Sequence, residues 1–340
     1  MKIVLDAFGG DHCPDSIIDG IVLANKEFND IEYIVTGDKN IITEYIKSKN
    51  YDLKNVEIVD AKEVITCHDT PTVAIKTKQD SSLVKAAEIL KSNDDVKALI
   101  STGSTGAVLA CGFLKIGRIK GVSRPALCPI LPTKKGTNVM LIDCGANADC
   151  KSINLCHFAI MGSLYYKEMF GVKEPRVALV NIGTEDEKGN ELAKQTFPLL
   201  KNLPINFVGN IETRDALSGD YDVLVCDGFT GNVLLKGIEG AVNLVLSELK
   251  CALKSSLTSK IGALFAKKAF KRLKNKLDYN KYGGSPFIGC KKTIIKSHGS
   301  SKAETICATI RQAYKYEQAK INEKINETIQ SLSPIEVEND

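Results

Sequence analysis

The sequence predicts an α/β fold built on a largely parallel sheet. Short apolar runs of strand length alternate with longer amphipathic segments of helix length, an order typical of parallel β-α-β units. The short runs are nearly continuous in Val, Ile and Leu, as expected for strands that are buried on both faces. The 340 residues are 44% hydrophobic and 25% charged, which is typical of a globular chain with a large core.

Eight segments have the length and composition of strands: residues 3–6, 31–36, 56–59, 98–101, 139–143, 177–181, 223–227 and 293–296. Helix-length segments lie between most of them, for example residues 14–28, 81–91 and 152–170. We expect residues 1–330 to form a single α/β catalytic domain. The polar and acidic residues 331–340 are expected to form a flexible tail.

Residues 230–277 differ from the rest of the chain and predict a helical hairpin. Residues 231–254 have the pattern of one long helix, 257–259 that of a tip, and 260–277 that of a returning helix. From Lys250 to Lys276 there are eight Lys and one Arg and no acidic residue, so this segment carries +9 and the remainder 4 − 9 = −5. The segment therefore predicts an acidic partner or an anionic surface.

The cysteine pattern and the N-terminus favour a cytoplasmic protein. The 11 cysteines are scattered and include no C-x-x-C pair, which is typical of reduced thiols. Asp6 follows the first apolar run too early for a secretory signal, and no apolar run has the length needed to span a bilayer.

Several predicted strands end in a turn rich in Gly, Ser, Thr, Asn or Asp. Six such loops occur, at residues 6–11, 101–106, 143–147, 181–186, 227–232 and 298–301. Ligands bind at the carboxyl ends of strands in open α/β sheets, so these loops are expected to converge on one site. Glycine lets backbone N–H groups approach a ligand, and the hydroxyl groups donate hydrogen bonds, so the site suits an anion. For any single loop a helix cap or a tight turn is the simpler interpretation, whereas six such loops together favour a shared site.

Several familiar catalytic motifs are absent from the sequence. There is no G-x-x-x-x-G-K-[ST] phosphate loop, no G-x-S-x-G nucleophile elbow, and no clear G-x-G-x-x-G after the first strand. The H-x4-D pattern of glycerol-phosphate acyltransferases and His-Cys clusters with zinc spacing are also missing. The pattern therefore indicates phosphate binding without an obvious nucleophile, base or metal site.

The loops resemble, in order from Met1 to about Ala319, the bacterial phosphate acyltransferase (PlsX) family. The matching motifs are D-A-F-G-G-D-H at 6–12, G-R-I-K-G at 117–121, R-P-A at 124–126, G-A-N at 145–147, G-T-E-D-E-K-G-N-E at 183–191, D-G-F-T-G-N-V at 227–233 and H-G-S-S at 298–301. The resemblance implies a three-layer Rossmann-like fold similar to that of phosphotransacetylases and isocitrate dehydrogenases.

The resemblance also implies an activity. Members of this family transfer an acyl group from acyl carrier protein to inorganic phosphate, and the acyl phosphate feeds a membrane enzyme that acylates glycerol 3-phosphate. It implies a cytoplasmic homodimer on the inner face of the cell membrane, whose partners are acyl carrier protein and the anionic lipid surface, with that downstream enzyme as a further candidate partner. No cofactor, metal or nucleic acid is implied.

By resemblance, Lys188 and Asn232 match the catalytic positions of the family. An ammonium can neutralise phosphate, and an amide can donate to the oxyanion that forms when phosphate attacks a thioester. A solvated lysine and a helix cap are the alternative interpretations of these two residues. The expected phosphate- and substrate-binding residues are Gly9, Gly10, Asp11, His12, Ser104, Thr105, Gly106, Asn147, Thr184, Asp227, Thr230, His298 and Ser300.

The sequence leaves open the roles of two histidines and three cysteines near these motifs. His12 and His298 could bind phosphate, shuttle a proton or make structural turn contacts. Cys13, Cys144 and Cys226 depart from the family pattern, and we interpret them as small buried apolar residues rather than thiolate nucleophiles.

The returning helix of the hairpin has apolar residues at helical spacing within a basic surround. Its expected membrane and carrier contacts are Leu257, Ile261, Leu264, Lys267, Lys268, Lys271 and Arg272. Such a helix can lie on an anionic bilayer, attract an acidic carrier protein, or pair with a second subunit. We expect these uses to overlap.

Three other functions remain compatible with the sequence. The first is a phosphotransacetylase-like enzyme that uses acyl-CoA. The second is a dehydrogenase of the same fold, which the missing nicotinamide loop and acidic metal ligands disfavour. The third is a non-catalytic scaffold on a lipid surface.

Overall fold

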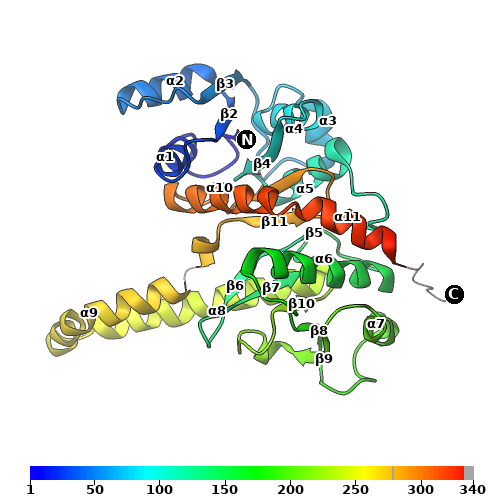
Figure 1. Ribbon diagram of the computed structural model, residues 1–340. Helices are drawn as coiled ribbons and strands as arrows, with labels where there is room; N and C mark the ends of the chain where they lie inside the picture. Colours follow the sequence, from blue (N-terminus) through cyan, green and yellow to red (C-terminus); the bar gives the residue numbers. More distant parts are fainter. Residues whose placement is uncertain (278, 333–340) are drawn as a thin grey trace.

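The computed structural model describes residues 1–277 and 279–332 and contains two sheets with helices packed on both faces of each. The N-terminal strands form the upper sheet in Figure 1 and the central strands the lower one. The predicted mixed α/β class with mostly parallel strands is confirmed.

The first sheet has the strand order β3-β2-β1-β4-β12-β11-β5. Its strands are β1 (Lys2–Asp6), β2 (Glu32–Gly37), β3 (Val56–Asp60), β4 (Val96–Ser101), β5 (Ala126–Leu127), β11 (Ser285–Ile288) and β12 (Thr293–Lys296). The first five strands in that order are parallel, and β11 and β5 continue the sheet in antiparallel pairs. A strand from the end of the chain thus lies between β4 and β11.

The second sheet has the strand order β6-β7-β10-β8-β9. Its strands are β6 (Ile130–Pro132), β7 (Asn138–Ile142), β8 (Val177–Asn181), β9 (Phe207–Glu212) and β10 (Val223–Val225). All pairs are parallel except β6 with β7. The carboxyl ends of β7, β10 and β8 therefore lie at one edge.

Helices cover both faces of each sheet, because the strands present apolar side chains on both sides. The helices are α1 (Asp15–Ala24), α2 (Lys39–Ser48), α3 (Pro71–Thr77), α4 (Ser82–Ser92), α5 (Thr105–Cys111), α6 (Ser152–Phe170), α7 (Glu191–Lys201), α8 (Gly228–Lys254), α9 (Leu257–Leu277), α10 (Ala303–Gln318) and α11 (Ile321–Ser331). One face of the first sheet packs on α1 and α10, and the other on α3, α4 and α5. The second sheet lies between α6, α7 and α11 on one side and the start of α8 on the other. Each half is thus a three-layer α/β/α arrangement.

All eight predicted strands are present, and the described residues form four further strands. β5, β6 and β11 have only two to four residues, too few for a periodic apolar pattern to be recognised. β9 includes Gly209, with φ +100°, and the polar Asn210, which weaken its strand signal.

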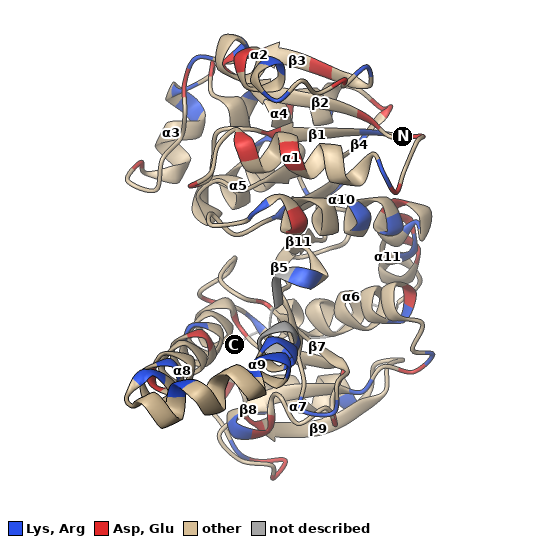
Figure 2. Cartoon of the chain, turned by 90° about the vertical axis from the view of Figure 1, so that its left-hand side faces the viewer, with Lys and Arg blue, Asp and Glu red and all other residues tan. Residues whose placement is uncertain are grey.

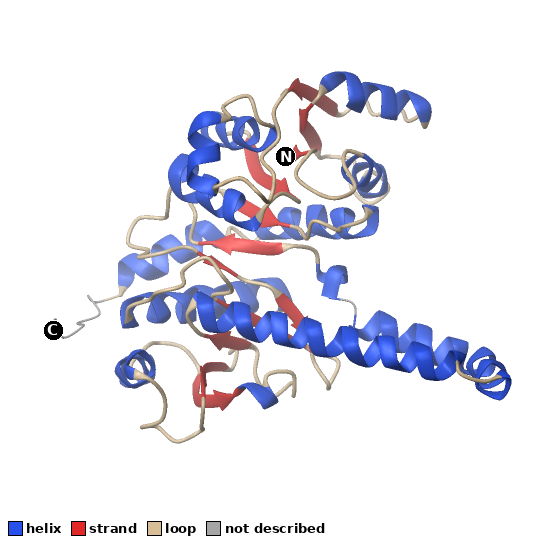
Figure 3. Ribbon diagram, turned by 180° about the vertical axis from the view of Figure 1, so that it is seen from behind, coloured by secondary structure: helices blue, strands red, loops and turns tan. Residues whose placement is uncertain are grey.

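The predicted helical hairpin is confirmed, with shifted ends. Helices α8 and α9 project together from the body (Figures 1 and 3). Asp227 begins α8 earlier than expected because its carboxylate accepts a hydrogen bond from the backbone N–H of Thr230 at 2.8 Å. At the far end, the Ser256 hydroxyl accepts from the Ser259 N–H at 3.0 Å, so α9 already begins at Leu257. The residues predicted as a tip therefore form the first turn of α9.

The predicted acidic tail lies largely outside the described residues. Its first residue, Ser331, is the last residue of α11. Within the described part of the chain, no helix combines the length and apolar character needed to cross a bilayer.

Candidate functional site

A cleft of about 130 Å³ lies between the two sheets and is lined by residues from both. The first sheet contributes residues that follow β4 and β12, and the second contributes residues that follow β7 and the first turns of α8. The polar lining residues are Thr105, Asn232, Lys236, Glu239, Tyr282, Ser285, Lys296, Ser297 and His298. An apolar wall is formed by Leu127, Pro129, Ile130, Leu131 and Leu235. The cleft therefore joins a polar end to an apolar wall.

Three of the predicted loops of the first sheet pack against one another. The backbone N–H of Asp11 donates to the carbonyl oxygen of Gly299 at 2.8 Å, which joins the loop after β1 to the loop after β12. A Cβ atom on Gly9 would lie 2.4 Å from the Cα of Gly103, so only glycine permits this approach. Gly10 is equally close to Thr102. The structure thus brings residues 9–12, 101–106 and 298–301 together.

The side chains in these loops have different surroundings. Thr105, at the start of α5, is exposed and lines the cleft, whereas Ser104 and Gly106 beside it are partly buried. His298 is exposed, and its Nδ1 atom lies 2.8 Å from the Ser300 hydroxyl. Desolvation of the imidazole where it meets the surrounding protein, assisted by the nearby Lys296 ammonium, lowers the pKa of His298, which favours the neutral ring. His12 and Asp11 are exposed.

In the second sheet, the buried Asp143 carboxylate organises the loop after β7. It accepts hydrogen bonds from the backbone N–H groups of Leu127 at 2.9 Å and Asn147 at 2.7 Å, and from the Asn147 side-chain amide at 2.9 Å. The Asn147 amide also donates to the Pro125 carbonyl at 2.8 Å. Asn147 therefore points into the protein and fixes the loop, and it does not line the cleft.

The loop after β10 places Asn232 in the cleft. The Asp227 carboxylate caps α8, and the Thr230 hydroxyl donates to it at 2.7 Å, so in this structure the two residues are engaged with each other. A Cβ on Gly231 would lie 2.0 Å from the Asp143 carbonyl oxygen, which requires glycine where α8 packs on the loop. Asn232 follows directly, is exposed, lines the cleft, and lies beside Gly145 of the loop after β7.

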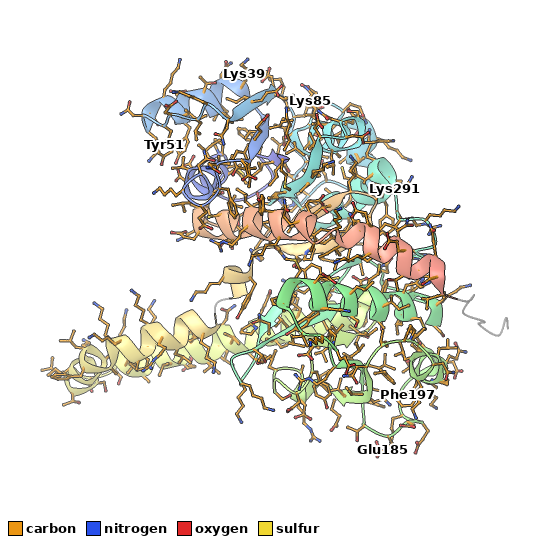
Figure 4. The ribbon with its side chains drawn as sticks, viewed as in Figure 1. Lys39, Tyr51, Lys85, Glu185, Phe197 and Lys291 are labelled. Atoms are coloured by element: carbon orange, nitrogen blue, oxygen red, sulfur yellow. The ribbon has the colours of Figure 1, made fainter. Side chains whose placement is uncertain are left out.

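The loop after β8 stands apart from this cleft. Thr184 and Lys188 are both exposed, and neither lines the cleft. The Lys188 carbonyl accepts from the Asn181 side chain at 2.9 Å, which fixes the loop backbone at the end of β8. Figure 4 shows Glu185 of this loop at the lower edge of the molecule, near Phe197 of α7. The loop thus lies at the same edge of the second sheet as the loops after β7 and β10, but it contributes no residue to the cleft lining.

Two lysines of the cleft were not predicted from the sequence. Lys236 lies one turn beyond Asn232 on α8 and pairs with Glu239 at 2.8 Å. Lys296 ends β12 and is only 8% exposed. The sequence does contain a signal that could have identified Lys296. A lysine stands at the end of an apolar strand pattern, two residues before His298.

The cysteines near the site behave as buried apolar side chains. Burial raises the pKa of Cys13 to about 11 and that of Cys144 to about 12, and it raises the pKa of Cys226 far above its usual value. These thiols are therefore protonated at neutral pH and poor nucleophiles. In the described residues, no group of three His, Cys, Asp or Glu side chains is arranged to hold a metal ion.

Comparison with known proteins identifies relatives across almost the whole chain. Residues 1–324 match the family model described as "Fatty acid synthesis protein". The phosphate acyltransferase of Clostridium perfringens strain SM101 is 48% identical over 334 residues, which cover 98% of both chains. The phosphate acyltransferase of Clostridium novyi is 46% identical over 330 residues, covering 97% of this chain and 99% of the relative.

Solved structures with the same fold have distant sequences. A phosphotransacetylase from Streptococcus pyogenes superimposes with a TM-score of 0.56 at 15% identity, covering 97% of this chain and 94% of the other. The EutD phosphotransacetylase from Staphylococcus aureus gives a TM-score of 0.55 at 15% identity, covering 98% and 94%. These likenesses confirm the predicted Rossmann-like three-layer fold. The family model and the close relatives from Clostridium show that this chain belongs to the phosphate acyltransferase family.

Proposed function

We propose that this protein transfers a fatty acyl group from acyl carrier protein to inorganic phosphate and so supplies acyl phosphate for phospholipid synthesis. The observation that carries the proposal is the cleft, in which hydrogen-bond donors and a buried cation face an apolar wall. The apolar wall suits an acyl chain, and the polar end suits phosphate and a thioester carbonyl. The close relatives named phosphate acyltransferases support the same reaction.

The reaction needs no enzyme nucleophile, because phosphate attacks the thioester carbonyl carbon directly. A carbon–oxygen bond forms, the carbonyl oxygen gains negative charge, and collapse of the tetrahedral intermediate breaks the carbon–sulfur bond. The thiolate of the carrier leaves and takes up a proton. In this scheme the Asn232 amide donates to the oxyanion. Lys188 neutralises phosphate, which requires its exposed loop to approach the cleft when substrate binds.

The first test is acyl phosphate formation from palmitoyl-acyl carrier protein and phosphate, trapped with hydroxylamine. We expect product from the wild type and a loss of about 10- to 100-fold for Lys188→Ala, because a charge-assisted hydrogen bond contributes roughly 1.5–3 kcal/mol. Lys194→Ala, which removes an exposed lysine on the neighbouring α7, is the matched control and should keep full activity.

The alternative functions give different results in the same assay. Product from acyl-CoA but not from the acylated carrier would indicate a phosphotransacetylase-like enzyme. No product from either donor, with folded protein that still binds lipid, would favour the scaffold. Equal activity of Lys188→Ala and Lys194→Ala would exclude the role of Lys188 while leaving the reaction intact.

We further propose that the hairpin bears the contacts with lipid, carrier protein and a second subunit. Leu257, Leu264 and Phe265 on α9 are 74%, 70% and 85% exposed, which is unusual for large apolar side chains. Figure 2, which looks onto the hairpin, shows Lys and Arg residues on both α8 and α9. Basic residues beside exposed apolar ones suit an anionic bilayer, and the same charges attract an acidic carrier protein. An apolar groove between the helices, lined by Leu246, Leu249, Leu253, Ala263, Phe270 and Leu273, suits pairing with a second copy.

Replacing Leu257 and Ile261 together with Glu is expected to reduce binding to anionic phospholipid vesicles by about tenfold or more. Burying a single large aliphatic side chain contributes roughly 1.5–3 kcal/mol, and added acidic groups are repelled by the bilayer. Vesicle cosedimentation measures the effect. The control is Ile41→Glu with Val208→Glu, which changes two exposed apolar residues on α2 and β9. Equal vesicle binding by both double variants would contradict the lipid contact.

A further inference from the structure

Lys296 is a buried lysine whose ammonium group lacks a carboxylate partner. Its Nζ atom lies 3.4 Å from the carbonyl oxygen of Thr102 and also donates to the carbonyl of Ser297. In the part of the chain that the structure describes, no ion pair involves this lysine. A lysine ammonium has three N–H donors, so one donor remains for another acceptor. Buried charges are normally paired, which makes this arrangement unusual.

The charges around Lys296 come from several elements and are mixed in sign. Asp6 of β1 and Asp11 of the following loop favour the ammonium form, whereas Lys236 of α8 disfavours it. His298, in the same loop as Lys296, has a lowered pKa, and Glu239 of α8 is already paired with Lys236. Burial prevails over these charges and lowers the pKa of Lys296 to about 8. The lysine is therefore mostly charged at neutral pH, and an added anion would compensate the charge.

We propose that Lys296 holds the attacking phosphate in the cleft. The inference rests on the proposed function and adds to it the residue that binds the acceptor substrate. Lys296 lines the same cleft as Asn232, which is proposed to meet the carbonyl oxygen, and as the exposed hydroxyl of Thr105. A phosphate bound to the ammonium therefore lies beside the thioester carbonyl that it attacks. Lys188 is on a loop outside the cleft and contacts this phosphate only after the loop has approached the cleft.

The test compares Lys296→Met with wild type in the full-length protein. Inorganic phosphate is titrated by calorimetry in the absence of any acyl donor. We expect Lys296→Met to weaken phosphate binding by at least about tenfold, because the ammonium contributes a charge-assisted hydrogen bond. In turnover, the KM for phosphate should rise by a similar factor while the KM for the acyl donor stays unchanged. Lys292→Met, at the opposite end of β12 and paired with Asp94 at 3.2 Å, is the matched control.

A purely structural lysine would give a different result. In that case Lys296→Met would melt at a lower temperature in phosphate-free buffer and, while folded, would bind phosphate as the wild type does. Unchanged phosphate affinity overturns the proposal. If phosphate binding depends on Lys296 but the acylated carrier is not a donor, the proposed function fails and the phosphate site stands.

The pH dependence of the wild type tests the same idea if the variant does not fold. Phosphate stays dianionic above neutral pH, whereas the free ammonium is lost as pH rises through about 8. Phosphate affinity should therefore fall with rising pH on the alkaline side of this value, approaching about tenfold per pH unit. An affinity that is constant through this range overturns the proposal.

Discussion

Asn232→Ala is expected to lower kcat for acyl phosphate formation by about 10²–10³ while leaving phosphate binding nearly unchanged. Removal of one oxyanion donor typically has this effect, because the donor interacts most strongly with charge that develops in the transition state. Asn232 is placed for the role, since it is exposed, lines the cleft and sits on the second turn of a capped helix. Its α8 backbone is held against the loop after β7 by the close approach of Gly231 to Asp143. The backbone that bears the amide is therefore held in place before substrate arrives.

The measurement is single-turnover formation of acyl phosphate at saturating phosphate. Asn243→Ala is the matched control, because it removes an exposed amide from the same helix outside the cleft lining. An Asn232→Ala variant that keeps more than about a tenth of the wild-type rate would be inconsistent with an oxyanion donor at this position. A raised KM for the acyl donor with unchanged kcat would indicate ground-state binding instead.

Asp143→Ala is expected to lower the free energy of unfolding by about 3–5 kcal/mol. The carboxylate accepts four hydrogen bonds, from three backbone N–H groups and the Asn147 amide, so its removal leaves several buried donors without a partner. Three of these four hydrogen bonds are fully buried. The loss should exceed that of most single substitutions.

Urea denaturation gives the change in the free energy of unfolding. Asp149→Ala, which removes an exposed carboxylate from the same connection, is the control and should stay within about 0.5 kcal/mol of wild type. Asp143→Asn keeps the size of the side chain and one acceptor oxygen, so its free energy of unfolding should lie between those of Asp143→Ala and Asp149→Ala. Burial raises the pKa of Asp143 in the folded protein, so lowering the pH toward that pKa should favour the folded state through this residue. Equal stability of the two Ala variants would contradict the organising role of Asp143.

The sequence predicted the fold class and the site loops because both depend on local patterns. Buried parallel strands have apolar runs, and the turns at their carboxyl ends need glycine and short polar residues, as Gly9 and Gly231 illustrate. The sheet to which each strand belongs is a long-range property. Nothing local in Thr293–Lys296 indicates that it pairs with β4, and β5 and β6 are too short to be recognised.

The functions of individual polar residues were harder to predict for the same reason. Asn147 and Asp143 lie in the same loop motif, but only the three-dimensional structure shows that the Asn147 amide turns inward to the carboxylate. Thr230 was expected to bind phosphate, and in the structure its hydroxyl donates to the Asp227 carboxylate that caps α8. In the sequence, Lys296 is only the last residue of a predicted strand. Its buried surroundings include Asp6 of β1 and Thr102 after β4, which are about two hundred or more positions away in the sequence.

The position of β12 between β4 and β11 has a consequence for the order in which the protein is made. When the first 280 or so residues have left the ribosome, β4 is the bare edge of a four-stranded parallel sheet, with its N–H and C=O groups free to pair elsewhere. Residues Thr293–Lys296 pair with that edge only after they too have left the ribosome, and the same segment supplies Lys296, Ser297 and His298 to the cleft. The nascent N-terminal half therefore has a sheet before it has the residues of the proposed phosphate site. A chaperone that shields β4 during this interval would protect the chain from aggregation at the stage when it is still inactive.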